Sequence, residues 1–203
     1  MSRVDVDAAV VALRIGGLVV LPTDTVYGLA CDPEQPEAVA LLAAVKRRLP
    51  DQPIALAVAS LEVLFDQLPE VPGRVRVVAD ELLPGPFTLV LPNPAQRFPS
   101  LAGSRADTIG VRVPDVRGIA NTILETVGAV AATSSNLHGG PDPRRLEDVP
   151  AEIAEAAVLV DGGELPGTPS TVIDLTTPEP AVLREGAVPA AEALARIHRL
   201  LPQ

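Results

Sequence analysis

Aromatic residues, cysteine and long apolar runs are scarce in this sequence. Aromatics make up 2% of its 203 residues, so a core has to be built from Ala, Val and Leu. The single cysteine, Cys31, excludes an internal disulfide bond and is typical of a reducing compartment. No apolar run approaches the roughly 18 residues of a membrane span, and no charged-then-apolar leader opens the chain. We therefore expect a cytoplasmic protein that does not bind membranes.

Positive charge is also scarce. The formal net charge is −10, and Lys46 is the single lysine among 16 Lys and Arg residues. Proteins that grip a nucleic-acid backbone need an excess of positive charge, so we expect direct nucleic-acid binding to be weak. An anionic small molecule would have to be bound by a few positive side chains that gather in one place.

Several well-known site motifs are missing. The sequence has neither a Gly-rich loop ending in Gly-Lys-Ser/Thr nor Gly-x-Gly-x-x-Gly after its first predicted strand. Two isolated histidines and one cysteine do not give the ligand spacing of a zinc site. Ser134 or Ser135 with His138 could serve a hydrolase, but the Gly-x-Ser-x-Gly elbow is absent, which disfavours this alternative.

Strand and helix patterns mix along the chain without strict alternation. Short apolar or alternating runs predict strands at 18–21, 54–58, 87–91, 108–113, 129–133, 158–160, 171–175 and 181–184. Periodicity and caps predict helices ending near Ile15 and over 36–48, 61–67, 72–82, 116–127 and 189–201. Residues 162–170 carry several Gly and Pro and are predicted to form a flexible loop. We predict a single α/β (α+β) domain over residues 1–203, with a mixed sheet flanked by helices.

The stretch from Leu21 to Leu29 reads Leu-Pro-Thr-Asp-Thr-Val-Tyr-Gly-Leu and follows an apolar strand directly. Hydroxyls and a carboxylate at such a position, together with Gly28, are typical of a ligand site at a strand end. We predict that this stretch forms a loop and one wall of a small-molecule site.

Other strand ends deliver polar groups of the same kind. Hydroxyls come from Thr25, Thr108, Ser134 and Ser170, and guanidinium groups come from Arg112 and Arg184. Hydroxyls and backbone amides bind phosphate or carboxylate oxygens, and arginine binds them with a two-pronged, charge-assisted contact. This set indicates a substrate with several anionic groups, such as a nucleotide used together with a carboxylate-bearing second substrate.

Motifs along most of the chain resemble those of the Sua5/YciO/YrdC family. They are Pro22-Thr23-Asp24-Thr25-Val26-Tyr27-Gly28-Leu29, Lys46-x-Arg48, Pro84-Gly85-Pro86-Phe87-Thr88, Thr108-x4-Val113-Pro114, Ser134-Ser135-Asn136, Ser170-Thr171-Val172-x-Asp174 and Leu183-Arg184-x-Gly186. They occur in the family's order and with similar spacing, from about Asp7 to Val188. The resemblance implies a YrdC/RibB-like twisted mixed sheet flanked by helices, with an open concave cleft.

The resemblance also implies L-threonylcarbamoyladenylate synthase activity, a nucleotidyltransferase reaction on ATP, L-threonine and bicarbonate. The product serves the threonylcarbamoyl modification of adenosine 37 in tRNA, so a tRNA threonylcarbamoyl transferase would be a downstream partner. In-line transfer of this type depends on positioning and charge neutralisation more than on a covalent nucleophile. Mg²⁺ would accompany ATP, held largely by the phosphates and water and not by a dedicated metal site of the protein.

Position by position, the resemblance assigns the candidate residues to two substrates. Thr25, Arg112, Ala132 and Ser170 match positions that contact threonine. Arg48, Gln52, Thr108, Ser134, Asn136, Asp142 and Arg184 match positions on the ATP side. Lys46 and Arg48 form the Lys-x-Arg motif, for which we expect ligand contact and a catalytic role in preference to simple stabilisation of a helix dipole. Tyr27 is expected to pack beneath the adenine or to order its own loop.

The sequence departs from the family pattern at Arg47, Gln52, Ala57, His138 and Asp142. Ala57 stands where a histidine is usual, which removes an expected contact on the threonine side. Asp142 replaces a hydroxyl, and a carboxylate there would repel phosphate unless Arg144, Arg145 or a metal ion intervenes. Two alternatives therefore stay open. One is a paralogue that binds nucleotide but uses another amino acid or carbamoyl acceptor, and the other is an RNA-binding module of the same fold.

Overall fold

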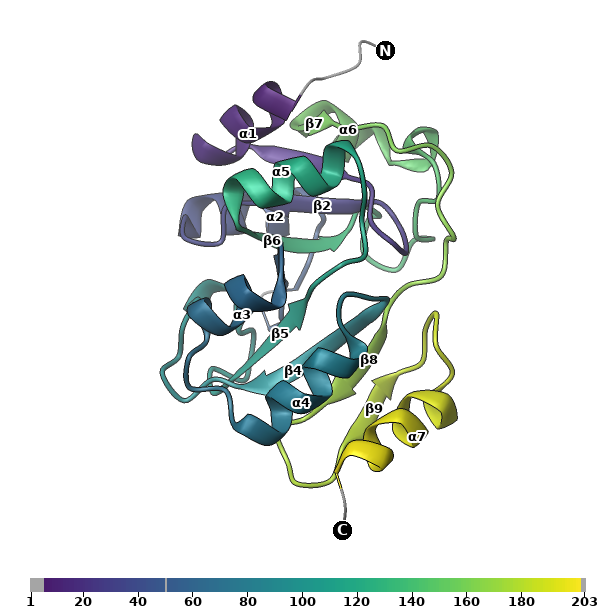
Figure 1. Cartoon of the computed structure of the whole chain (residues 1–203). Helices are drawn as coiled ribbons and strands as arrows, with labels where there is room; N and C mark the ends of the chain where they lie inside the picture. The colour runs from purple at the N-terminus through teal and green to yellow at the C-terminus, as the bar shows by residue number, and fades with distance from the viewer. Residues whose placement is uncertain (1–5, 50, 202–203) are drawn as a thin grey trace.

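The computed structural model describes residues 6–49 and 51–201, and its strands form one mixed sheet (Figure 1). The strands are β1 (Leu18–Leu21), β2 (Gly28–Cys31), β3 (Ala55–Val58), β4 (Phe87–Pro92), β5 (Thr108–Arg112), β6 (Ala129–Ser134), β7 (Ala157–Leu159), β8 (Thr171–Asp174) and β9 (Ala181–Arg184). Their order in the sheet is β7-β1-β2-β6-β3-β5-β4-β8-β9. The pairs β1/β7, β3/β5 and β4/β8 are parallel, and the other neighbours are antiparallel. The predicted mixed α/β fold is confirmed.

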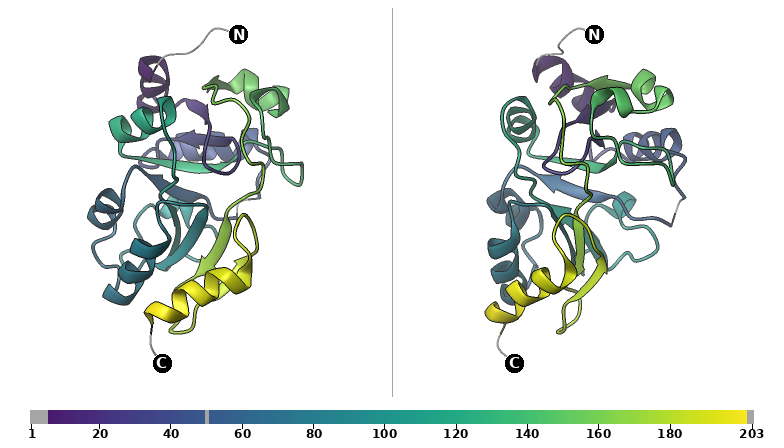
Figure 2. Two further views of the ribbon diagram at one scale, coloured as in Figure 1. Left: turned by 45° about the vertical axis from the view of Figure 1, so that its right-hand side comes forward. Right: turned by 90° about the vertical axis from the view of Figure 1, so that its right-hand side faces the viewer.

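Helices flank the twisted sheet on both sides (Figure 2). They are α1 (Val6–Arg14), α2 (Pro36–Val45), α3 (Leu61–Gln67), α4 (Gly73–Leu82), α5 (Ile119–Val127), α6 (Ala151–Ala156) and α7 (Ala190–Leu200). Successive strand residues point to opposite faces of the sheet, so each strand contributes to two packing layers. Leu29, Leu56 and Leu89 pack with α2, α3, α4 and α7 into the larger core, whereas Val19 and Val130 pack with α1 and α5. Among the residues described, no helix has the length and apolar character of a membrane span.

Several elements differ from the predictions made from the sequence, and one of them is α5, which begins at Ile119 and not at Val116. Gly28–Cys31 forms β2 and not part of a loop, because its backbone pairs with β1 and with the distant β6. The α2 helix ends at Val45 and not at Arg48, because Arg47 adopts a positive φ of 55° that breaks the helical hydrogen-bond pattern. The α6 helix was not predicted, since so short a helix depends on the packing of buried Ile153 more than on its own periodicity.

The sheet face that packs against α1 and α5 at one end is hollow farther along. Several strand residues on the hollow part are small, and they include Gly28, Ala55, Ala57, Gly110 and Ala132. In the strand register, Ala57 of β3 lies between Val130 of β6 and Arg112 of β5. Because these side chains are short, they leave a concave floor on which a ligand can lie.

Candidate active site

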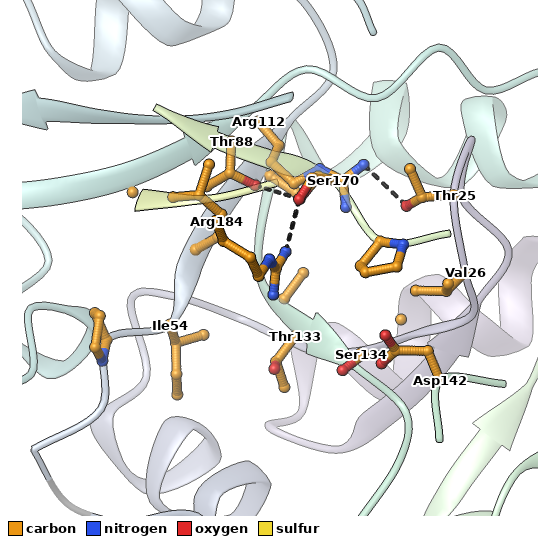
Figure 3. Close-up of a pocket in the computed structure, with 18 of the residues that line it drawn as sticks. Thr25, Val26, Ile54, Thr88, Arg112, Thr133, Ser134, Asp142, Ser170 and Arg184 are labelled. Carbon is orange, nitrogen blue, oxygen red and sulfur yellow. Dashed lines mark hydrogen bonds between the residues drawn. The ribbon is translucent and has the colours of Figure 1, made fainter. Parts of the chain in front are cut away.

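A cavity of about 570 Å³ occupies this hollow face, a size that suits a small-molecule ligand (Figure 3). The residues assigned to threonine, to ATP or to the Lys-x-Arg motif all line it: Thr25, Lys46, Arg48, Gln52, Thr108, Arg112, Ala132, Ser134, Asn136, Asp142, Ser170 and Arg184. The structure brings these side chains together around one cavity, and the roles assigned to them stay predictions. In Figure 3 the labelled polar residues form two groups, with Arg112 and Ser170 in one and Ser134 and Asp142 in the other.

Arg112 is held in place by the loop between β1 and β2. Its Nη2 donates to Asp24 Oδ1 at 2.7 Å and to Thr25 Oγ1 at 3.2 Å. Asp24 also accepts a hydrogen bond from the backbone N–H of Asp115 at 3.2 Å, so Asp24 ties two loops to the guanidinium. Within the described part of the chain, Arg112 Nε has no hydrogen-bond partner. This buried donor is left for a ligand or a water molecule to satisfy.

Arg184 reaches the same end of the cavity from β9. Its Nη2 donates to Ser170 O at 2.9 Å and to Ser170 Oγ at 3.2 Å, and Ser170 Oγ lies 2.8 Å from Thr88 Oγ1. The pKa of Arg112 is lowered mainly by burial, Asp24 opposes this shift, and repulsion from Arg184 adds to it. Two guanidinium groups thus converge near Ser170, and an anionic ligand between them would relieve their repulsion.

Lys46 points into the loop that follows β6. Its Nζ donates to Ser134 O at 2.6 Å, to Asn136 O at 2.8 Å and to Asn136 Oδ1 at 2.6 Å. The pKa of Lys46 is lowered to about 8, mainly by burial and also by repulsion from Arg48, while Asp142 opposes the shift. Three close acceptors use the three N–H donors of the ammonium, so Lys46 fixes the shape of this loop.

Arg48 lies at the floor of the same end of the cavity. Its Nη1 donates to Thr133 Oγ1 at 3.3 Å, its Nε to Gln52 O at 3.4 Å, and its Nη2 to Pro53 O. Burial lowers the pKa of Arg48. Gln52 Oε1 is a second buried atom for which the described residues offer no hydrogen-bond partner. Arg48 therefore shapes the 52–53 segment and brings a positive charge to the cavity.

Asp142 lines the cavity, as Ser134 does (Figure 3). The two arginines that could have neutralised it point elsewhere: Arg144 Nη2 lies 3.1 Å from Glu164 Oε1, and Arg145 Nη2 lies 2.5 Å from Glu164 Oε2. Neither arginine pairs with Asp142. A phosphate at this position would therefore meet the carboxylate unless a cation lies between them.

Neither Ser134, the last residue of β6, nor Ser135, which follows it, is arranged as a nucleophile. Ser134 Oγ donates to Asn136 Oδ1 at 2.6 Å, and Ser135 Oγ donates to Tyr27 O at 2.9 Å. His138 is exposed at the cavity rim, and neither of these hydrogen bonds involves it. This arrangement disfavours the hydrolase alternative.

Residues 161–170, which we call the strap, run from β7 to β8 beside the cavity. Tyr27 is fully buried, and its hydroxyl donates to Gly163 O at 2.8 Å and accepts from Gly162 N at 2.9 Å. Burial is the main cause of the raised pKa of Tyr27. Gly167 N donates to Thr25 O at 2.8 Å. Tyr27 does not line the cavity, so of the two predicted roles it orders loops, its own stretch and the strap, and is not placed to pack beneath an adenine.

Some lining residues were not nominated from the sequence as site residues. They include Val26, Pro53, Ile54, Ala55, Thr88, Val90, Gly110, Pro114, Thr133, Pro169 and Val172. Several alternate along β3, β4 and β5, because every second residue of a strand faces the cavity. The alternation of small residues at Ala55 and Ala57 was the signal that could have found this floor.

Comparison with known proteins places the chain in a family. The Sua5/YciO/YrdC family model, described as "Telomere recombination", matches residues 11–186. Threonylcarbamoyl-AMP synthase of Pyrococcus abyssi (strain GE5 / Orsay) is 37% identical over 183 residues, which cover 89% of this chain and 53% of the relative. Threonylcarbamoyl-AMP synthase of Chromohalobacter salexigens is 35% identical over 173 residues, which cover 84% of this chain and 92% of the relative.

A solved structure agrees with the sequence comparisons. The crystal structure of P. abyssi Sua5 complexed with L-threonine matches with a TM-score of 0.82 and 33% identity, over 98% of this chain and 59% of that chain. The chain thus spans about half the length of the curated Pyrococcus relative, 53%, and nearly all of the Chromohalobacter one, 92%. Since the family model covers most of the sequence and the fold agrees, this chain belongs to the Sua5/YciO/YrdC family.

Proposed function

We propose that this protein is an L-threonylcarbamoyladenylate synthase, a nucleotidyltransferase that supplies the threonylcarbamoyl group for adenosine 37 of tRNA. The observation that carries the proposal is a single cavity with two polar ends. Arg112, Thr25 and Ser170 form the end proposed for the amino acid, and Arg48 and Ser134 form the end proposed for the nucleotide. Relatives that carry the name threonylcarbamoyl-AMP synthase, and a Sua5 structure that contains L-threonine, support it.

The proposed reaction has two steps, and neither needs a protein nucleophile. The amine of threonine attacks the carbon of bicarbonate and water leaves, which gives a carbamate. A carbamate oxygen then attacks the α-phosphate of ATP, and pyrophosphate leaves. Both steps depend on placing anions next to one another, so the site must position them and neutralise their charge.

The side chains of the cavity can supply this positioning. Arg112 has a free Nε and a guanidinium fixed by Asp24, which suits the threonine carboxylate. Arg184 and Arg48 both line the cavity and bring positive charge to it, which suits the phosphates. Gln52, whose Oε1 is unpaired within the described residues, suits a donor group of the adenine. Lys46 holds Ser134 and Asn136 in place, so we assign it a positioning role.

Mg²⁺ fits this site as a companion of ATP. Among the residues that the structure describes, no group of three or more His, Cys, Asp or Glu side chains could hold a metal ion. Asp142 is the carboxylate that lines the nucleotide end, and neither Arg144 nor Arg145 neutralises it. One carboxylate together with phosphates and water is a donor set that magnesium accepts. Bound there, the ion would neutralise phosphate charge.

Pyrophosphate release from ATP and bicarbonate, with and without L-threonine, tests the proposed function. We expect release that requires threonine, and we expect Arg48→Ala and Ser134→Ala to reduce its rate. Absence of threonine-dependent release would exclude this function. Release that requires a different amino acid instead would identify the chain as a paralogue of altered specificity.

A further inference from the structure

Thr88 lines the candidate active site, and no role in the proposed reaction has been assigned to it. It ends the motif of residues 84–88, in which Phe87 is buried in the larger core. Successive strand residues point to opposite faces of the sheet, so Thr88, the next residue of β4, faces the cavity. Its Oγ1 lies 2.8 Å from Ser170 Oγ, and this is the one hydrogen bond that its side chain makes with the described residues (Figure 3).

The sheet fixes the position of Ser170 beside Thr88. β4 and β8 are parallel neighbours in which Thr88 pairs with Val172, and Thr171 N donates to Pro86 O at 3.0 Å. Ser170 directly precedes β8 and is 4% exposed. The backbone therefore brings the two hydroxyls together, and a ligand would meet them already in place.

A count of donors and acceptors shows what the two hydroxyls offer to a ligand. Arg184 Nη2 donates to Ser170 Oγ at 3.2 Å and, being a donor only, occupies one of the two acceptor positions of that oxygen. The hydrogen bond between Thr88 and Ser170 can run in either direction, and in both cases it uses one hydroxyl hydrogen. The other hydroxyl hydrogen has no acceptor among the described residues. The pair thus presents one O–H donor to the cavity.

An anionic ligand would decide the direction of this hydrogen bond. Arg112 and Arg184 converge near Ser170, so an anion attracted by them comes close to the Ser170 hydroxyl. A hydrogen bond from a hydroxyl to an anion is stronger than one to a neutral oxygen, so Ser170 donates to the anion. Ser170 Oγ then has one acceptor position left, which suits the hydrogen of Thr88. In such a chain each hydrogen bond polarises and strengthens the next.

We propose that Thr88 is a positioning residue for the amino-acid substrate: its hydroxyl donates to Ser170 Oγ and thereby commits the Ser170 hydroxyl to the carboxylate of the bound amino acid. The inference rests on the proposed function for the identity of that ligand. It also gives the motif of residues 84–88 a role in the site, because this motif carries Thr88 and binds the residue after Ser170 through Pro86 O.

Binding of L-threonine, measured by titration calorimetry, tests the proposal without requiring turnover. Thr88→Val keeps the shape of the side chain and removes its hydroxyl, and we expect it to weaken binding about fivefold, the effect of one net hydrogen bond. Thr88→Ser restores the hydroxyl and should bind threonine nearly as tightly as the wild type. In a Ser170→Ala background, Thr88→Val should have no further effect, because the group through which Thr88 acts is already gone.

Thr177→Val is the matched control, because the Thr177 hydroxyl donates to Glu179 O in an exposed turn and does not line the cavity. It should leave threonine binding unchanged. Melting curves establish that each variant folds, and Thr88→Ala, which removes the same hydroxyl, takes the place of Thr88→Val if that variant does not fold.

Unchanged threonine affinity in Thr88→Val overturns the proposal. An equal loss with and without the Ser170 hydroxyl overturns it too, because Thr88 would then act independently of Ser170. If threonine binds but no pyrophosphate is released, the proposed function fails while the comparison of single and double variants still decides this inference. If threonine does not bind to the wild type, both fall.

Discussion

Lys46 and Arg48 stand two residues apart in the sequence but have different surroundings. The positive φ of Arg47 turns the chain between them. Lys46 is buried and donates to oxygens of Ser134 and Asn136. Arg48 instead donates hydrogen bonds to the backbone oxygens of residues 52 and 53. The Lys-x-Arg motif therefore combines one residue that shapes the loop with one that brings positive charge to the cavity.

The stability of the protein should depend on the ionisation of Lys46. The pKa of Lys46 is about 8 in the folded chain, below its usual value of 10.5. Between these values the unfolded chain binds more protons, so the free energy of unfolding should rise with pH relative to a Lys46→Met variant. The slope of the difference is at most about 1.4 kcal/mol per pH unit, the value for one proton. Urea unfolding of both proteins near the two ends of this pH window measures it, and a difference that is flat or falls with pH contradicts the prediction.

If Arg112 holds the threonine carboxylate as proposed, replacing it by lysine should weaken the binding of threonine selectively. Lysine keeps the charge but cannot make a two-pronged contact with a carboxylate while remaining bonded to Asp24. We expect the KM for threonine to rise about tenfold, equivalent to roughly 1.4 kcal/mol, with little change in ATP binding. Arg105→Lys is the control, because Arg105 pairs with Asp174 and does not line the cavity. Equal effects of the two substitutions would remove Arg112 from the threonine site.

The strap shows how one element is ordered by a few distant contacts. It has no regular secondary structure, yet the hydroxyl of Tyr27 and the carbonyl of Thr25 bind its backbone. Gly167 has a φ of +82°, and a Cβ atom there would lie 2.2 Å from Cδ of Arg144. The exposed Arg144 side chain can move away from such an atom, so it is the left-handed φ that favours glycine here, and the backbone path of the strap depends on it.

Tyr27→Phe should loosen the strap and leave the sheet intact. The substitution removes a hydroxyl that bonds Gly162 and Gly163, at a cost of about 1 to 2 kcal/mol. We expect faster cleavage within residues 161–170 in limited proteolysis, located by mass spectrometry. Thr176→Val is the control, because it removes a comparable hydroxyl hydrogen bond, to Asp174, in a turn outside the strap. It should not increase cleavage within residues 161–170. Identical cleavage patterns of Tyr27→Phe and wild type would show that the hydroxyl does not anchor the strap.

The molecule as a whole is acidic, whereas its candidate site is not. The formal net charge is −10, yet Lys46, Arg48, Arg112 and Arg184 all face one cavity. Local positive charge on an acidic protein attracts a small anion while the overall field repels a long polyanion. This distribution favours a nucleotide over a nucleic acid as the ligand.

Binding to tRNA should accordingly be weak. We expect no strong complex in filter-binding or anisotropy measurements at about 50 mM salt, where a phosphate-binding protein would bind most tightly. Strong RNA binding that falls steeply between about 50 and 200 mM salt would contradict this prediction and would revive the RNA-binding alternative. A basic RNA-binding domain measured in the same series serves as the positive control.

Much of the fold and of the residue set could be predicted from the sequence, because both leave local signals. Apolar runs end at polar groups, so strands such as β1 and β6 were placed within one residue of their ends. β2 escaped prediction because Gly28–Cys31 becomes a strand only through pairing with β1 and β6. The end of α2 was not predicted, because an arginine gives no indication in the sequence that its φ angle will be positive.

Most of the strands, the acidic charge, the absence of a nucleophile motif and the list of polar candidates follow from the sequence, since each depends on residue type and spacing. Their meeting in one cavity depends on a strand order that interleaves distant segments, with β6 between β2 and β3. The partner of Tyr27, the positioning role of Lys46 and the pairing of Thr88 with Ser170 follow only from packing, because each is made by residues far apart in the chain. The local pattern of residue types decides which segments become helices and strands, and the burial of apolar side chains decides which of the remaining side chains face the cavity.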